Sequence, residues 1–212
     1  MNDTLKSSLQ SKRSGTTDKG LERAHEILDA ARRIFAAEGY AGLSMRRVAT
    51  EVGVSLSNVQ HYYNSKDMLV EAVLLYTMNM FQEKIDQITS TMARSPRTEQ
   101  FQSTIDMFLQ ELSDPITVAV FFEIWALATR NPFASGLMDK MLARERKAIF
   151  KLIQGLAPSI SDAQYQLRAA LIVAQIQGLL LFRLCNPAKK AELAGLELAA
   201  KEAVLRLAML PD

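Results

Sequence analysis

Apolar residues recur at steps of three and four along nearly the whole chain, which is the spacing of one face of a helix. No run of alternating apolar and polar residues predicts a strand. The first apolar stripe ends at Gly39 and consists of Ala24, Ile27, Leu28, Ala31, Ile34 and Phe35. A stripe of this width predicts a helix with one buried face. The pattern as a whole predicts an all-α protein of about nine helices.

Two short helices and a long one are predicted next. Ser44 is of the type that caps a helix N-terminus, and apolar positions 48, 49 and 52 follow it. Residues 53–55, Gly-Val-Ser, break this helix, and a third short helix extends to about Tyr62. Lys66 opens a long fourth helix. Helices this short bury little apolar surface separately, so residues 21–66 are expected to pack as one three-helix domain.

Polar residues and prolines divide the remainder into five further helices. They are expected near residues 101–112, 115–130, 132–157 and 161–186, with a last one that reaches the C-terminus. The helix at 115–130 is apolar almost all round, which predicts a central position, and Ser161 is the expected cap of the one after 161. Residues 67–212 form the second expected domain. Residues 1–20 are polar and basic and are expected to form a disordered arm.

The 212 residues have an ordinary globular composition, 49% hydrophobic and 23% charged. No stretch approaches the roughly 18 uninterrupted apolar residues of a membrane span, and the N-terminus lacks the apolar core of a secretory signal. Cys185 is the only cysteine, which excludes an internal disulfide and fits a reducing cytoplasm. With two histidines besides, no metal or other cofactor is expected.

The charge and the second short helix together suggest contact with DNA. Residues 1–66 hold 10 Lys and Arg against 7 Asp and Glu, an excess where phosphate contacts need it. Asn58 or Gln60 can pair bidentately with adenine in the major groove, and Arg46, Arg47 and Lys66 would lie near phosphates. The polar face of the helix consists of Ser55, Leu56, Ser57, Asn58, Gln60, His61 and Tyr62. From spacing alone, a solvated helix face remains the alternative.

Three runs of residues in this region form part of a sequence pattern found in a known protein family: 27–31 (Ile-Leu-Asp-Ala-Ala), 35–40 (Phe-Ala-Ala-Glu-Gly-Tyr) and 43–49 (Leu-Ser-Met-Arg-Arg-Val-Ala). Gly-Val-Ser at 53–55 and His-Tyr-Tyr at 61–63 belong to the same pattern. Over about residues 23–70 the chain thereby resembles the tetracycline-repressor (TetR) family. The resemblance implies a dimeric, ligand-responsive regulator of transcription, usually a repressor, that binds a near-palindromic operator on double-stranded DNA.

By position, the resemblance implies that Ser44 and Arg46 hold phosphate, that residues 55–62 enter the major groove, and that Tyr62 and Lys66 clamp the DNA backbone. Gln60 departs from the family, which commonly has a phosphate-contacting tyrosine there. We therefore expect Gln60 to recognise a base, and the backbone contact on that side to differ from the family's.

The N-terminal arm carries Lys6, Lys12, Arg13 and Lys19 among Ser, Thr and Gly. One interpretation is a disordered tail without a role in binding. The other is a basic arm that reaches an adjacent groove, as in other helix-turn-helix proteins. The sequence leaves both open.

An aromatic and methionine-rich set in the second domain is expected to line an effector cavity, with Met supplying adaptable walls. Glu123 stands out in it, because an ionised carboxylate in an apolar helix is costly unless paired. Arg130 or Arg183 would satisfy it, or it would anchor a polar or cationic effector. The expected lining is Phe101, Ile105, Phe108, Phe121, Phe122, Glu123, Trp125, Met138, Met141 and Gln175, with plain core packing as the alternative for each.

The last two helices carry more apolar and small residues than the outside of a monomer should show, and a two-fold interface would bury them. The expected interface residues of the homodimer are Leu167, Ala170, Leu171, Ala174, Gly178, Leu181 and Leu205. Two recognition helices about one DNA turn apart also discriminate better than one. Cys185 lacks a resolving cysteine, which favours an inert thiol over a redox sensor.

These observations predict a dimeric repressor that a small-molecule effector releases from DNA. The alternative from a different class is a DNA-binding protein whose C-terminal domain docks a protein partner and takes no effector. An enzyme is not expected, because the sequence has no Gly-rich phosphate loop, nucleophile–base arrangement or metal-ligand spacing.

Replacing Gln60 by Ala should change the preference for one base pair by about 1–3 kcal/mol, because a bidentate contact to one base is lost. Binding to a set of operators that differ at single positions measures this. A uniform loss of affinity across the set would show instead that Gln60 contacts phosphate.

Overall fold

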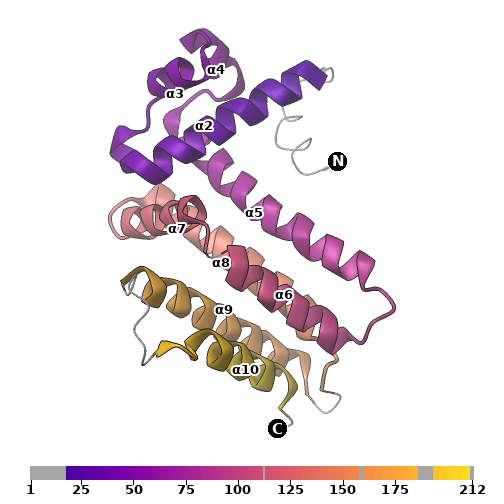
Figure 1. Ribbon diagram of the computed structural model, residues 1–212. Helices are drawn as coiled ribbons and strands as arrows, with labels where there is room; N and C mark the ends of the chain where they lie inside the picture. Colours follow the sequence, from indigo (N-terminus) through magenta and orange to yellow (C-terminus); the bar gives the residue numbers. More distant parts are fainter. Residues whose placement is uncertain (1–17, 112, 158–159, 186–192, 211–212) are drawn as a thin grey trace. The chain divides into compact units, whose positions relative to one another are not determined.

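The computed structural model describes residues 18–111, 113–157, 160–185 and 193–210, and in these residues it has nine helices and no strand (Figure 1). This confirms the all-α prediction. In chain order the helices are α2 (Asp18–Gly42), α3 (Met45–Val52), α4 (Leu56–Tyr62), α5 (Lys66–Thr91), α6 (Arg97–Glu111), α7 (Pro115–Ala128), α8 (Pro132–Ile153), α9 (Asp162–Cys185) and α10 (Leu196–Met209).

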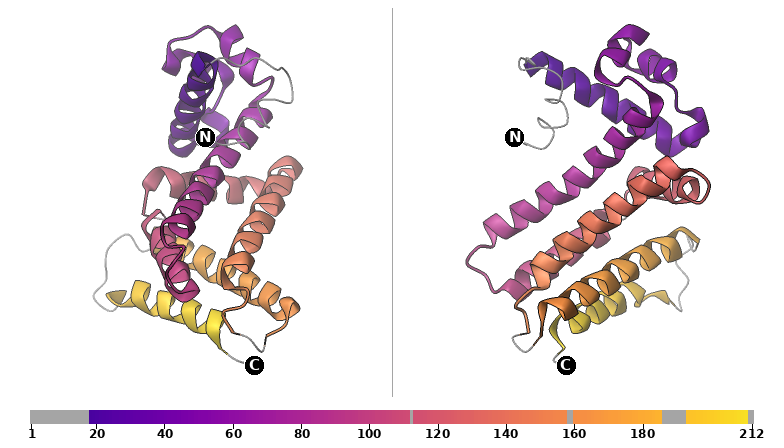
Figure 2. Two further views of the ribbon diagram at one scale, coloured as in Figure 1. Left: turned by 90° about the vertical axis from the view of Figure 1, so that its right-hand side faces the viewer. Right: turned by 180° about the vertical axis from the view of Figure 1, so that it is seen from behind.

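The described helices group into two compact units. The first contains the described residues up to Met80 together with Pro115–Leu137, and the second contains Phe81–Asp114 together with the described residues from Met138 onward. The first unit therefore extends beyond residue 66, because α7 packs against α2 (Figures 1 and 2). The division into domains at 21–66 and 67–212 stays a prediction.

Local sequence sets the ends of the short helices as predicted. The Ser44 hydroxyl accepts a hydrogen bond from the backbone N–H of Arg47 at 3.1 Å, so it caps α3. Gly53, at φ 72°, ends α3 in the left-handed conformation that glycine adopts without strain. The predicted stripe of the first helix is also confirmed, since all six of its residues from Ala24 to Phe35 are buried.

Two polar contacts join α2 and α7 inside the first unit. The buried Arg32 donates from its guanidinium to the Thr117 hydroxyl at 2.6 Å. Glu123 accepts a hydrogen bond from the backbone N–H of Tyr40 at 2.7 Å. Around them α7 buries Val120, Phe121 and Ile124 on one face, while the side chains on its other faces are half-buried or exposed although they are also mostly apolar. The polar contacts thus lie within an otherwise apolar packing of two helices.

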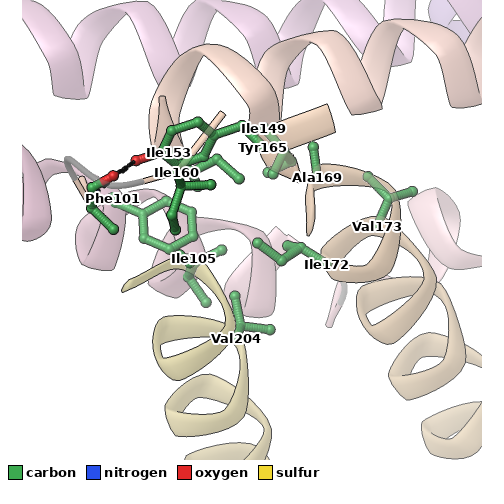
Figure 3. Close-up of a cluster of buried hydrophobic side chains, with 12 residues drawn as sticks. Phe101, Ile105, Ile149, Ile153, Ile160, Tyr165, Ala169, Ile172, Val173 and Val204 are labelled. Carbon is green, nitrogen blue, oxygen red and sulfur yellow. Dashed lines mark hydrogen bonds between the residues drawn. The ribbon is translucent and has the colours of Figure 1, made fainter. Parts of the chain in front are cut away.

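The second unit has its own core, a cluster of buried side chains from α6, α8, α9 and α10 (Figure 3). Tyr165 is its largest member, and its hydroxyl donates to the carbonyl of Ala157 at 2.6 Å and accepts from the N–H of Ala157 at 2.7 Å. One residue thereby satisfies both backbone groups where the chain leaves α8. Ser161 caps α9, as predicted, by accepting from the N–H of Gln164.

Helix α9 is long and apolar enough, by length and composition, to cross a membrane. Its apolar residues are divided between two faces. Ile172 and Val173 belong to the core cluster, whereas Leu167, Leu171 and Leu181 are exposed. This two-sided pattern is typical of a helix that packs inward on its own subunit and outward on another protein surface.

Replacing Tyr165 by Phe should lower the free energy of unfolding by about 1–3 kcal/mol, because the buried N–H and C=O of Ala157 lose their partner. Chemical denaturation measures the loss. Tyr62→Phe, which removes a hydroxyl from a half-buried ring, is the matched control. Equal stability of the two variants would contradict the role given to the Tyr165 hydroxyl.

Candidate nucleic-acid interface

Helix α4 presents a small polar face to solvent. Ser57, Gln60 and His61 are exposed, and their i, i+3, i+4 spacing places them on one side of the helix. Val59 and Tyr63 lie on the opposite side and are buried, as the sequence predicted. Of the seven residues predicted to face DNA, four are exposed and three are half-buried: Ser55, Ser57, Gln60 and His61, and Leu56, Asn58 and Tyr62.

Three of the predicted residues at the start of α4 are partly engaged within the molecule. The Ser55 hydroxyl caps α4 by accepting from the N–H of Asn58 at 3.2 Å, and it also shares a hydrogen bond with Ser57. Asn58 is half-buried, and its side-chain oxygen is buried without a hydrogen-bond partner among the described residues. Leu56 is half-buried. The first turn of α4 makes up about half of this seven-residue helix, and the Ser55 cap holds that turn in place.

The two arginines of α3 differ. Arg46 is exposed and makes no ion pair within the described part of the chain, so it is open to a phosphate next to the exposed Ser44. Arg47 pairs with Glu51 at 3.0 Å and with Glu38 at 3.3 Å, and these contacts, the Glu51 hydrogen bond first, raise its pKa. A phosphate contact by Arg47 must compete with two carboxylates. Its i, i+4 spacing to Glu51 was the sequence signal for this.

Lys66 begins α5, and its ammonium lies over the ring of Tyr40, 3.9 Å from the ring centroid. Partial burial lowers the pKa of Lys66, and the neighbouring carboxylate of Asp67 opposes this shift. Tyr62 is half-buried, with the ring of His61 edge-on to it at 5.2 Å between centroids. Sequence reasoning did not single out Tyr40, because a contact between residues 26 apart leaves no local pattern.

The residues expected to line an effector cavity are distributed over both compact units. In the second unit, Phe101, Ile105 and Met141 are buried, Met138 is half-buried, and Phe108 stacks on Phe81 at 5.5 Å between centroids. Phe101 and Ile105 are members of the core cluster, which is the packing alternative named for them. In the first unit Phe121 is buried and Phe122 contacts Trp125 edge-on.

Two polar members of that set are placed differently from expectation. Glu123 accepts a hydrogen bond from the backbone N–H of Tyr40, and Arg183, one of the two arginines expected as its partner, is paired with Glu197 instead. Gln175 lies on the exposed side of α9, because its helical phase follows Leu171 rather than Val173.

Gln177 takes the inward position on α9 instead, and its amide donates to the Glu145 carboxylate of α8 at 2.7 Å. Burial raises the pKa of Glu145 to about 7, while the Gln177 hydrogen bond and the charge of Arg146 act in the opposite direction. Glu145 forms no ion pair within the described residues. The sequence did not single out Glu145, since it lies in a charged stretch of α8.

A hollow of about 500 Å³ between α8 and α9 shares no residue with the expected cavity lining. It is lined by Arg146, Lys147, Phe150, Lys151, Gln154 and Gln166. Among the described residues, no group of three or more His, Cys, Asp or Glu side chains is placed to hold a metal ion. Lys6, Lys12 and Arg13 of the arm, and the side chain of Cys185, lie outside what the structure describes.

The expected dimer residues mostly lie at the surface. Leu167 is 63% exposed, Leu171 46% and Leu181 48%, and Ala174 and Gly178 lie on the same side of α9. Ala170 is half-buried, and Leu205 packs against the core cluster, so it contributes less to an outer face. Phe182 of α9, which was not predicted, is 43% exposed, and Leu198, one of the apolar residues expected on the outside of the last helix, is 64% exposed.

A capped two-helix motif with a polar outer face, carried on an all-α chain with a separate C-terminal core, defines a helix-turn-helix regulator of transcription. Residues 27–73 match the family model for bacterial regulatory proteins of the tetR family, and residues 97–208 match the model for the C-terminal part of BetI-type transcriptional repressors. The second model alone spans more than half of the chain. The protein belongs to the TetR family.

Relatives among curated sequences are also regulators of transcription, not enzymes. The chain is 29% identical, over 74% of its length and 77% of the relative's, to an uncharacterized helix-turn-helix-type transcriptional regulator in the dhlA 5′ region of Xanthobacter autotrophicus. It is 27% identical, over 65% of its length and 70% of the relative's, to the nicotine-responsive transcriptional repressor HdnoR of Paenarthrobacter nicotinovorans.

Solved structures show the same fold. The fatty acid degradation regulator FadR of Bacillus halodurans superimposes with a TM-score of 0.69 at 19% identity, over 92% of this chain and 97% of that one. A TetR transcription regulator of Haloarcula marismortui gives a TM-score of 0.68 at 19% identity, over 88% and 96% of the two chains.

Replacing Glu145 by Gln should make the protein more stable above neutral pH. The pKa of Glu145 is raised on folding, so between about pH 4.5 and pH 7 the folded state binds more protons than the unfolded state, and this group's contribution to stability falls as the pH rises. The variant should gain about 1–3 kcal/mol at pH 8 and little at pH 5.

Denaturant unfolding at both pH values measures this difference. Glu99→Gln, at an exposed position of α6, is the control and should follow the original protein at both pH values. Identical pH profiles for Glu145→Gln and the original protein would contradict the raised pKa.

Proposed function

We propose that the chain acts in the cytoplasm as a homodimeric repressor that binds a near-palindromic operator and is released from it by a small-molecule effector. The observation that carries the proposal is the exposed polar face of Ser57, Gln60 and His61 on a short capped helix. Arg46 and Lys66 flank it on the neighbouring helices as cations for phosphate. The family membership supports sequence-specific DNA binding, repression and response to a ligand.

The exposed face of α9 supports the dimer. Leu167, Leu171 and Leu181 recur along one side of the helix with Ala174 and Gly178 between them. Small residues between large ones allow two helices to approach closely, and a two-fold axis would pair the same face of each subunit. An apolar face of this length is costly on an isolated subunit in water.

Trp125 supports an effector rather than a docked protein partner. Its indole N–H is buried and has no acceptor among the described residues. Buried donors are nearly always paired, so this group suits a ligand that brings an oxygen or nitrogen acceptor into the interior. A protein partner that docks on the outside would not reach a buried N–H.

Glu145 supports a positively charged group on the effector. Its partly buried carboxylate has a neutral amide as its hydrogen-bond partner and retains room for further donors, since a carboxylate offers about four acceptor sites. A protonated amine would satisfy it and lower its pKa again. The relative named as nicotine-responsive is consistent with a basic nitrogen compound as effector.

Selection from random duplex DNA is expected to return a near-palindrome that the protein binds as a dimer. Leu171→Glu should shift the protein to monomer in sedimentation and lower operator affinity by at least about tenfold, because a charge is placed in the apolar interface. Gln87→Glu, on an exposed position of α5, controls for the added charge.

Release is tested on the same complex with a panel of neutral and cationic small molecules, nicotine among them. Cationic compounds should release the original protein at lower concentration than Glu145→Gln. Recovery of no preferred sequence would overturn the proposed function. A preferred half-site bound by a monomer would overturn the dimer, and release by a purified protein but by no small molecule would favour the partner-docking alternative.

A further inference from the structure

Tyr40 lies at a junction of three elements in the first compact unit. Its backbone N–H donates to Glu123 of α7 at 2.7 Å, and its hydroxyl donates to Asp67 of α5 at 2.6 Å. Its ring supports the ammonium of Lys66 at 3.9 Å from the centroid. The backbone, the ring and the hydroxyl of one residue are thus each engaged by a different partner.

The backbone around Tyr40 is built for this contact. Gly39 interrupts the helical geometry of α2 at φ 68°, ψ −174°, which turns the next N–H toward α7. A Cβ on Gly39 would come within 2.9 Å of the Glu123 carboxylate oxygen. Only glycine allows both the left-handed φ and the close approach of the carboxylate. The position of Tyr40 is therefore fixed from the side of α7.

The other end of Tyr40 is fixed by Asp67. The Asp67 hydrogen bond, followed by burial, raises the pKa of the Tyr40 hydroxyl, so the phenol stays protonated and continues to donate. Asp67 and Lys66 are the first two residues of α5, where the carboxylate also suits the helix N-terminus. The ring and the ammonium are consequently held in one arrangement by contacts on both sides.

We propose that Tyr40 is a positioning residue for DNA binding, and that its ring holds the Lys66 ammonium at the start of α5 in the orientation that meets a DNA phosphate. An ammonium has three N–H donors, and a ring on one side leaves the others directed away from it. Glu123 and Asp67 fix the ring. The inference rests on the proposed function, in that it requires Lys66 to contact DNA.

A double-mutant cycle on the full-length protein tests the link, with the selected operator as the probe. Lys66→Ala should weaken binding to all sequences by about tenfold and reduce the slope of log affinity against log salt by about one unit for each Lys66 that contacts phosphate. Tyr40→Leu removes the ring and should weaken binding by several-fold. The double variant should bind no more weakly than Lys66→Ala, because the ring acts only through the ammonium.

Conservative variants separate positioning from general stability. Tyr40→Phe keeps the ring and loses the Asp67 hydrogen bond, so it should retain more affinity than Tyr40→Leu. Glu123→Gln keeps an acceptor for the Tyr40 N–H and should bind DNA like the original protein, whereas Glu123→Ala should lose affinity. Thermal unfolding of every variant identifies those that fail to fold. If Tyr40→Leu is one of them, the DNA affinity and salt slope of Tyr40→Phe test the positioning role instead.

The outcomes are distinguishable. Additive losses in the double variant, or Tyr40→Leu binding with unchanged affinity and salt slope, would overturn the positioning role while DNA binding stands. Lys66→Ala with an unchanged salt slope would overturn it as well, because Lys66 would then not touch phosphate. Failure of the original protein to bind any duplex would instead overturn the proposed function itself.

Discussion

A seven-residue helix is not stable alone in water, and this constraint governs the whole DNA-binding part of the molecule. Helix α4 is that helix, and it exists because other elements support it. Val59 and Tyr63 are buried beneath it, Ser55 caps its start, and Gly53 sets the turn that brings it against α3. Its outer residues can face solvent because its inner residues and its first turn hold the helix in place.

The packing of α2 against α7 also depends on polar groups that need partners. An arginine and a glutamate inside an apolar packing are costly unless each finds a partner. Arg32 donates to Thr117, and Glu123 accepts from a peptide N–H that the turn at Gly39 exposes. Removing either partner would leave a polar group buried, so these contacts specify one packing of the two helices. Tyr40 lies at the end of that packing and connects it to the start of α5.

The second unit meets a different constraint, because one helix must serve two surfaces. Helix α9 supplies Ile172 and Val173 to the core and leaves Leu167 and Leu171 exposed. Because both of its faces carry apolar residues, α9 is apolar enough, as well as long enough, to suit a membrane span. The hydrogen bond from Gln177 to Glu145 is a polar contact between α8 and α9. Burial at this contact raises the pKa of the Glu145 carboxyl to about 7.

The sequence by itself determined the helices, their caps and breaks at Ser44, Gly53 and Ser161, and the family, because these depend on residues a few positions apart. Periodicity also determined the buried side of α2 and the exposed side of α9. It could not determine which polar residues meet. That Glu123 would accept from the Tyr40 backbone rather than pair with an arginine depends on residues 83 positions apart.

The tertiary structure likewise decided that the side-chain oxygen of Asn58 is buried and that Gln177, not Gln175, faces α8. It also placed Lys66 over the ring of Tyr40. Spacing along a helix tells which residues share a face, but the partner of a polar group is whatever donor or acceptor the folded chain brings within about 3 Å. That distance is set by the packing of whole helices, which no local pattern encodes.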